Sequence, residues 1–154
     1  FLEMGADGVQ MATRFVGTYE CDADDGFKQR YIECQMEDLT IIDSPVGLPG
    51  RAIINDFIRQ VRDGFRKPYE CPWQCLKTCD VSNAPYCIAR ALTEAKYGNF
   101  EEGFAFAGAN AYKVKNLVHV EELIESLESE YRSAEESNNM QKGNVTPQSL
   151  TMDM

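Results

Sequence analysis

The chain is poor in basic residues, in histidine and in long apolar runs. Its 154 residues hold 25 acidic but only 15 basic side chains, which gives a formal net charge of -10. This balance argues against nucleic acid as a partner, because neutralising phosphates needs clustered Lys and Arg. No apolar run is long enough to span a bilayer, so we expect no membrane protein. No signal-peptide pattern opens the chain, and we therefore expect a cytoplasmic location.

The rest of the composition is that of a folded protein. Hydrophobic residues make up 44% and charged residues 26% of the chain, which is typical of a globular domain and not of a disordered segment. The length allows one domain. The chain opens on Phe1 and not on Met, and we therefore expect it to be part of something longer.

Helix and strand patterns alternate at the start of the chain, which predicts an α/β fold. Gly5 is expected to close a helix, and residues 8–12 read as a short buried strand followed by a loop at residues 13–15. Residues 22–34 are predicted to form a helix. Asp22 or Asp24 would cap it, and one face would carry Phe27, Tyr31 and Cys34.

The spacing of apolar residues and the turn residues predict the remaining elements. We expect a strand at 39–42, a turn-rich loop at 44–50, a helix at 51–61, an irregular segment at 62–84, a helix from Pro85 to Tyr97 stopped by Gly98, and a last helix with an apolar stripe at 120–131. That stripe predicts docking on the rest of the protein or on a partner. Residues 134–154 lack periodicity and predict a poorly ordered tail.

Small and hydroxyl residues follow the predicted strand at 8–12. In parallel α/β folds, ligands bind beyond the carboxyl ends of the strands. Small residues let backbone N–H groups approach a phosphate, and the Thr13 hydroxyl can donate a hydrogen bond to it. The pattern by itself fits either such a site or an ordinary junction of strand and loop.

Four segments together resemble one known family. The run Gly5–Phe15 resembles the last barrel strand of the nitronate monooxygenase family, which also includes flavin-dependent enoyl-acyl-carrier-protein reductases. The resemblance continues in order through Glu20–Asp22, Ser44–Ala52 and Gly103–Ala111. It covers residues 1–131, and the ordered series is more specific than any single motif.

The resemblance implies the C-terminal portion of a TIM-type (β/α)8 barrel that binds FMN. The chain would supply the last strand and the C-terminal helices. The implied segments are the last strand with its phosphate-side loop (1–18), a helix, strand and helix (19–65), a Cys-rich segment and helix (66–98), a flavin-proximal loop and last helix (99–133), and a disordered tail (134–154).

The resemblance also implies the cofactor-binding residues. The loop after the last strand would hold the FMN phosphate through Gln10, Met11, Ala12 and Thr13, and a second loop would approach the flavin through Gly108 and Asn110. Ala12 stands where the family usually has Gly. Its methyl group crowds the phosphate slightly, but its backbone N–H remains.

No catalytic residue is assigned within the chain. The family's catalytic histidine and glycine-rich loop are expected upstream of Phe1. His119, the single histidine, stands beside apolar positions near the last helix, and we interpret it as structural. The chain is therefore expected to be inactive alone.

The cysteines form a second candidate site. Cys71, Cys75, Cys79 and Cys87 have the spacing C-x3-C-x3-C-x7-C. Four thiolates could bind zinc or an iron–sulfur cluster if the segment is a loop, although the common C-x2-C pairs are absent. The other interpretation is buried thiols that pack against the rest of the protein.

These features lead to three functional hypotheses. The first is part of an FMN-dependent oxidoreductase that oxidises alkyl nitronates with O2. The second is a flavin-dependent enoyl-thioester reductase that uses NAD(P)H, and the third is an iron–sulfur or zinc binding module. A small-molecule substrate is the expected partner, and a homo-oligomer remains open.

Overall fold

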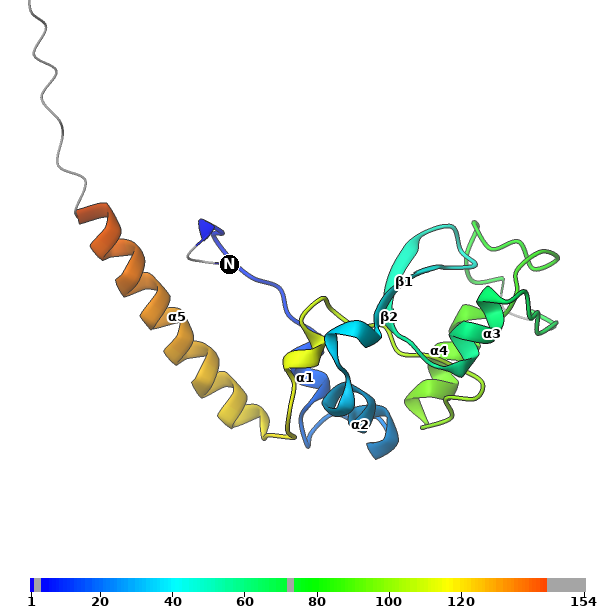
Figure 1. Ribbon diagram of the computed structural model, residues 1–154, viewed down its shortest axis with the longest axis horizontal. Helices are drawn as coiled ribbons and strands as arrows, with labels where there is room; N and C mark the ends of the chain where they lie inside the picture. Colours follow the sequence, from blue (N-terminus) through cyan, green and yellow to red (C-terminus); the bar gives the residue numbers. More distant parts are fainter. Residues whose placement is uncertain (2–3, 72–73, 144–154) are drawn as a thin grey trace, which may run out of the picture. The chain divides into compact units, whose positions relative to one another are not determined.

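The computed structural model describes residues 1, 4–71 and 74–143 (Figure 1). The chain divides into two compact units, one formed by residues 1–11 and the segment from Val120 onward, the other by Ala12–His119. Of the helices in the described ranges, none has both the length and the apolar character needed to cross a membrane.

The larger unit, Ala12–His119, alternates helices with a hairpin. Its elements are α1 (Thr13–Val16), α2 (Asp25–Glu33), the 3-10 turn η2 (Met36–Asp38), β1 (Leu39–Asp43), β2 (Pro49–Ile53), α3 (Asp56–Arg62), α4 (Ile88–Lys96) and the 3-10 turn η3 (Ala111–Lys113).

The sheet of this unit is the antiparallel hairpin β1–β2. Leu39 lies opposite Ile53 and Asp43 opposite Pro49. The connecting turn contains Gly47 at φ 85°, a left-handed conformation that favours glycine. Residues 104–107 run along the other side of β2, where the N–H of Ile53 donates to the carbonyl of Ala105 at 3.1 Å. Strand β2 therefore lies between β1 on one side and this extended segment on the other.

Two hydrophobic cores lie on the two faces of this sheet. In Figure 1, α3 and α4 lie on one side of the hairpin and α2 on the other. The first core joins the sheet to α3 and α4 through Ile42, Ala52, Phe57, Ile58, Tyr86, Ala91 and Phe104. The second joins it to α2 and η3 through Tyr31, Cys34, Ile53, Ala105, Ala107 and Ala111. The unit is thus a layered α/β arrangement.

Several predicted elements are confirmed. The Asp24 carboxylate caps α2 by accepting from the Gly26 N–H at 2.8 Å, and the predicted apolar face buries Tyr31 and Cys34. The strand predicted at 39–42 is β1. Helix α4 begins at Ile88, a little after Pro85, and is followed by Gly98 at φ 82°. These segments carry strong local signals for their ends.

Two predicted elements are wrong. Residues 8–12 form no strand, because no strand lies beside them in the described part of the chain to accept and donate ladder hydrogen bonds, and residues 13–16 are the helix α1 instead of a loop. The first three residues of the helix predicted at 51–61 belong to a strand instead. Pairing with β1 draws Arg51–Ile53 into β2, and Asn55 then caps the shorter helix α3.

The smaller unit contains the last helix, α5 (Val120–Gly143). It continues well beyond the apolar stripe, so the predicted tail is wrong for 134–143, while 144–154 lie outside the described residues. Hydroxyl groups such as that of Ser133, which donates to the Ser129 carbonyl at 3.0 Å, are satisfied along the helix. Beyond the apolar stripe, good helix formers such as Glu and Met continue it.

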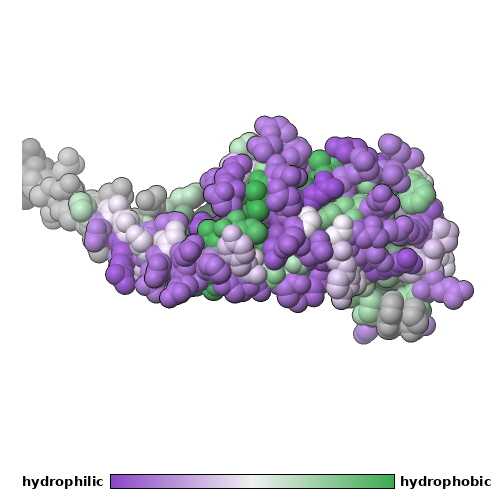
Figure 2. All heavy atoms as spheres, turned by 90° about the horizontal axis from the view of Figure 1, so that it is seen from below, coloured by the Kyte–Doolittle hydropathy of each residue, from purple (hydrophilic) through white to green (hydrophobic). Residues whose placement is uncertain are grey.

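Within this smaller unit, α5 and four residues of the N-terminal segment, Phe1, Gly8, Val9 and Met11, line one groove of about 1080 Å³. Val9 and Met11 face it from the N-terminal segment, and Ile124, Leu127 and Tyr131 face it from α5. Leu123 is buried, as its place in the stripe predicts. Elsewhere, the face drawn in Figure 2 is mostly hydrophilic, with hydrophobic side chains in small groups.

Candidate functional site

Two of the predicted cofactor-binding residues are in direct contact. The backbone N–H of Gly108 donates to Thr13 Oγ1 at 3.0 Å, although 95 positions separate the two in sequence. A methyl group at Gly108 would lie 3.2 Å from the same oxygen, so glycine gives the hydroxyl the space it occupies. The fold therefore brings the start of α1 and the loop after residue 107 together.

The loop that carries Gly108 is held firmly by its neighbours. The Tyr31 hydroxyl donates to the Phe106 carbonyl at 2.6 Å, and the Ala107 N–H donates to the Arg51 carbonyl at 2.9 Å. Burial raises the pKa of Tyr31 well above its usual range, which keeps the hydroxyl protonated as a donor. Gly50 directly precedes Arg51 in the hairpin, and a side chain there would collide with the Phe106 ring.

The remaining predicted cofactor residues are exposed. Ala12 precedes α1, and Asn110 precedes η3 without capping it through its side chain. Gln10 and Met11 belong to the other unit, where both are exposed and Met11 lines the apolar groove. In the larger unit, the described arrangement thus offers a hydroxyl in contact with a small-residue loop, and an exposed amide two residues further along that loop.

This arrangement can bind an anion. Thr13 Oγ1 accepts from Gly108, which leaves the hydroxyl hydrogen to donate elsewhere. For the described residues, no acceptor of that hydrogen and no partner of the Asn110 amide is found. Such donors beside small residues suit a phosphate or carboxylate.

The cysteines do not form a recognisable metal centre. Cys71, Cys79 and Cys87 are half-buried, Cys75 is exposed, and all are free thiols. Among the residues that the structure describes, no group of three or more His, Cys, Asp or Glu side chains is arranged to hold a metal ion. The zinc or iron–sulfur hypothesis gains no support.

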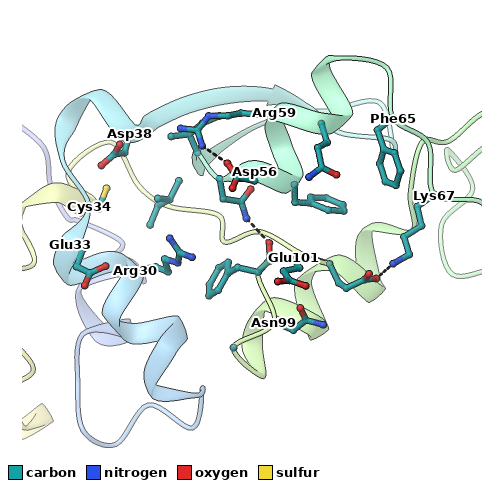
Figure 3. Close-up of a pocket in the computed structure, with 18 residues that line it drawn as sticks. Arg30, Glu33, Cys34, Asp38, Asp56, Arg59, Phe65, Lys67, Asn99 and Glu101 are labelled. Atoms are coloured by element: carbon teal, nitrogen blue, oxygen red, sulfur yellow. Dashed lines mark hydrogen bonds and ion pairs between the residues drawn. The ribbon is translucent and has the colours of Figure 1, made fainter.

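A polar groove of about 990 Å³ lies elsewhere in the larger unit (Figure 3). Charged side chains of both signs line it from α2, η2, α3 and the loop after α4. Arg59 pairs with Asp56 at 2.8 Å, Lys67 pairs with Glu102, and Arg30 lies over the Phe100 ring. None of the predicted cofactor residues lines this groove, and its cations already have partners, so we assign no cofactor to it.

One residue at this groove has a structural role that the periodicity misses. Asn55 is buried and caps α3 through the Ile58 N–H at 3.0 Å, while its amide donates to the Gly103 carbonyl at 2.7 Å and to the Phe100 carbonyl at 3.2 Å. It ties the hairpin to the segment that leads to Gly108. An Asn directly before an apolar helical run is a capping signal that could have located the start of α3.

His119 makes structural contacts, in keeping with its interpretation. Its Nδ1 lies 3.0 Å from Glu20 Oε1, and its ring lies 4.7 Å from that of Tyr19. A short parallel bridge joins Thr18 to Val118 next to this contact. The contacts fasten the two ends of the larger unit to each other.

Known proteins give an independent comparison. The family described as nitronate monooxygenase matches residues 1–130. A curated protein of Mycobacterium tuberculosis, (3aS,4S,5R,7aS)-5-hydroxy-7a-methyl-1-oxo-octahydro-1H-indene-4-carboxyl-CoA dehydrogenase, is 23% identical, over 80% of this chain and 42% of its own length.

Solved structures show the same fold in part of a larger protein. FabK from Thermotoga maritima matches with a TM-score of 0.67 and 23% identity, over 94% of this chain and 42% of FabK. A single-site variant of that FabK matches with a TM-score of 0.65 and 21% identity, over 90% of this chain and 38% of the variant.

The chain thus spans less than half the length of these relatives. At such identities the structural likeness shows an α/β fold shared with the matching part of FabK. The family match extends over most of the chain and includes both loops that meet at Thr13 and Gly108. The chain belongs to the nitronate monooxygenase family.

Proposed function

We propose that this chain is the C-terminal portion of an FMN-dependent oxidoreductase of barrel fold that oxidises alkyl nitronates with O2. The observation that carries the proposal is the contact between Thr13 Oγ1 and the Gly108 N–H. It joins the two loops that the family resemblance assigns to the flavin. Membership of the nitronate monooxygenase family supports the same class of reaction.

The residues present fit the phosphate end of FMN. Gly108 leaves room beside Thr13 that a side chain would fill, since a methyl group there would lie 3.2 Å from the hydroxyl oxygen. Ala12 is small, and the Asn110 amide is exposed. Thr13 would donate to the phosphate, with Ala12 and Gly108 allowing close approach, and Asn110 would add a second donor.

The chain's own part in the chemistry is positioning. When bound, FMN would supply the redox chemistry through its ring. Thr13, oriented by Gly108, would hold the cofactor's phosphate end. Tyr31 and Asn55 keep the segment 103–108 in place through hydrogen bonds to the carbonyls of Phe106 and Gly103. No residue of the chain is assigned to proton transfer.

A second candidate function is the reduction of an enoyl thioester with NAD(P)H. The name of the curated relative from Mycobacterium tuberculosis identifies a carboxyl-CoA dehydrogenase, and thus an enzyme that acts on a CoA thioester. That relative supports a thioester substrate for this chain as well. The same phosphate site would serve either reaction, because both use the flavin.

The first experiment measures flavin binding. We expect the polypeptide that carries this chain to be yellow as purified, or to quench FMN fluorescence when FMN is added. Removal of the 5′-phosphate, by offering riboflavin instead of FMN, should weaken binding, because Thr13 would lose its acceptor. A protein that neither carries nor takes up flavin would refute the proposal.

The second experiment separates the two reactions. Oxygen consumption with an alkyl nitronate, in the absence of NAD(P)H, supports the nitronate monooxygenase activity. Oxidation of NAD(P)H that depends on an enoyl thioester supports the alternative. A flavin-loaded protein that shows only the second activity would overturn the nitronate assignment and leave the flavin site intact.

A further inference from the structure

The irregular segment before α4 gathers three thiols around one tyrosine. Tyr69 Oη lies 3.4 Å from Cys79 Sγ. Cys71, Cys79 and Cys87 are half-buried, whereas Cys75 is exposed. All four are free thiols, and the flavin site described above uses none of them.

One backbone hydrogen bond explains why Cys87 lies near the same tyrosine. The N–H of Lys67 donates to the Pro85 carbonyl at 2.7 Å, which sets the two stretches side by side. Tyr69 and Cys87 each follow two residues later, and both line one small cavity with Tyr86. The shared cavity and the backbone hydrogen bond therefore both place Cys87 near Tyr69.

A tight turn brings Cys79 back toward Cys87. The Asp80 carbonyl accepts from the Asn83 and Ala84 N–H groups at 3.1 and 2.7 Å. The Asp80 carboxylate accepts from the Asn83 amide at 2.7 Å and from the Ser82 N–H at 3.1 Å, and the first of these bonds lowers its pKa. The turn therefore reverses the chain between Cys79, which contacts Tyr69, and Cys87, which lines the same cavity as Tyr69.

The electrostatics of Tyr69 agree with this geometry. Burial raises the pKa of its hydroxyl most, followed by the hydrogen bond with Cys79 and by the charges of Cys79, Cys87 and Cys71. Cys75 is absent from these causes. The exposed thiol is therefore a matched control for the clustered ones.

We propose that Cys79 and Cys87 are an oxidation site, at which hydrogen peroxide converts the two thiols into an intramolecular disulfide. The thiolate of one cysteine attacks a peroxide oxygen, the O–O bond breaks, and a sulfenic acid and one water result. The second thiol attacks that sulfur, the S–S bond forms, the S–O bond breaks, and a second water leaves. The two thiols together lose two electrons, and the peroxide gains two.

The disulfide would fasten the irregular segment to the start of α4. Cys87 is the residue that precedes the helix, and Cys79 lies on the far side of the Asp80 turn. Oxidation would therefore lock the turn. Dithiothreitol should release the bond, since a dithiol reduces an exposed disulfide by exchange.

Peptide mapping tests the pairing directly on the unmodified chain. Trypsin releases residues 78–90 as one peptide that contains both Cys79 and Cys87, whereas Cys71 and Cys75 precede the cleavage site at Lys77. After treatment of the folded protein with hydrogen peroxide and then iodoacetamide, we expect this peptide unalkylated and lighter by two hydrogen atoms. Cys75 should be alkylated in the same sample.

Three controls make the test decisive. In denaturant, shorter loops such as Cys75 to Cys79 close more readily, so the selectivity for the 78–90 bond should be lost. Cys75→Ser should keep the bond, and Cys79→Ser should abolish it. A cross-link from residues 78–90 to Cys71 or Cys75, the same selectivity in denaturant, or two alkylated thiols in the 78–90 peptide would overturn the proposal.

Discussion

Thr13 Oγ1 accepts a 3.0 Å hydrogen bond from the backbone N–H of Gly108. One residue begins a short helix near the start of the larger unit, and the other begins a loop near its end. The bond consumes the N–H of Gly108 and aims the Thr13 hydroxyl hydrogen away from it. This relationship makes Thr13 the residue on which the proposed phosphate site depends.

Replacing Thr13 tests that site. We expect Thr13→Val to weaken FMN binding by about tenfold or more, because a hydrogen bond to a charged group contributes about 1.5–3 kcal/mol. Thr13→Ser keeps the hydroxyl and should bind FMN close to the wild-type affinity. Isothermal titration of each purified protein measures the difference. Equal losses in both variants would show that the hydroxyl plays no part.

The buried amide of Asn55 should be important for stability. Asn55→Ala removes the cap of α3, worth about 1 kcal/mol, and leaves the Gly103 and Phe100 carbonyls without their donor, at about 1–3 kcal/mol more. Asn55→Asp keeps the cap but sets a carboxylate against those carbonyls, so it should rescue little. Urea unfolding measures both. The exposed Asn116→Ala is the control, and full rescue by Asp would contradict the argument.

Gly103 packs against the backbone of α4. A methyl group there would collide with the Ala91 carbonyl oxygen and lie 2.9 Å from the Ala95 nitrogen, neither of which can move without bending the helix. We expect Gly103→Ala to cost about 1–3 kcal/mol of unfolding free energy. Gly8→Ala, where nothing lies within 4 Å, is the control. Thermal unfolding that is unchanged at Gly103 would disprove the close packing.

The stability of the protein should fall at alkaline pH because of Tyr86. Its ring packs edge-on against Phe57 and Phe104, and burial raises its pKa from 10.0 to about 12. Above pH 10.0 the unfolded chain loses this proton while the folded chain keeps it, so stability present below that pH declines up to about pH 12. Tyr86→Phe should decline less over this window. Parallel pH profiles of urea unfolding for both proteins would reveal the difference.

Local signals explain which elements could be predicted. Asp24, Gly98 and the spacing of Tyr31 and Cys34 act within one or two helical turns, so α2 and the end of α4 follow from sequence. Residues 51–61 show helical spacing, yet Arg51–Ile53 pair with β1 because a hairpin with a glycine turn precedes them. Whether a segment forms a strand depends on its partner strand, and the periodicity of one segment carries no information about that partner.

The sequence by itself determined the family and the cap of α2 at Asp24, because ordered motifs and residue types are properties of the chain alone. Only the tertiary structure decided that Thr13 meets Gly108, that Tyr69 contacts Cys79, and that Tyr69 shares a cavity with Cys87. Such contacts join distant positions, and their geometry is set by two packed cores and the hydrogen bonds between them.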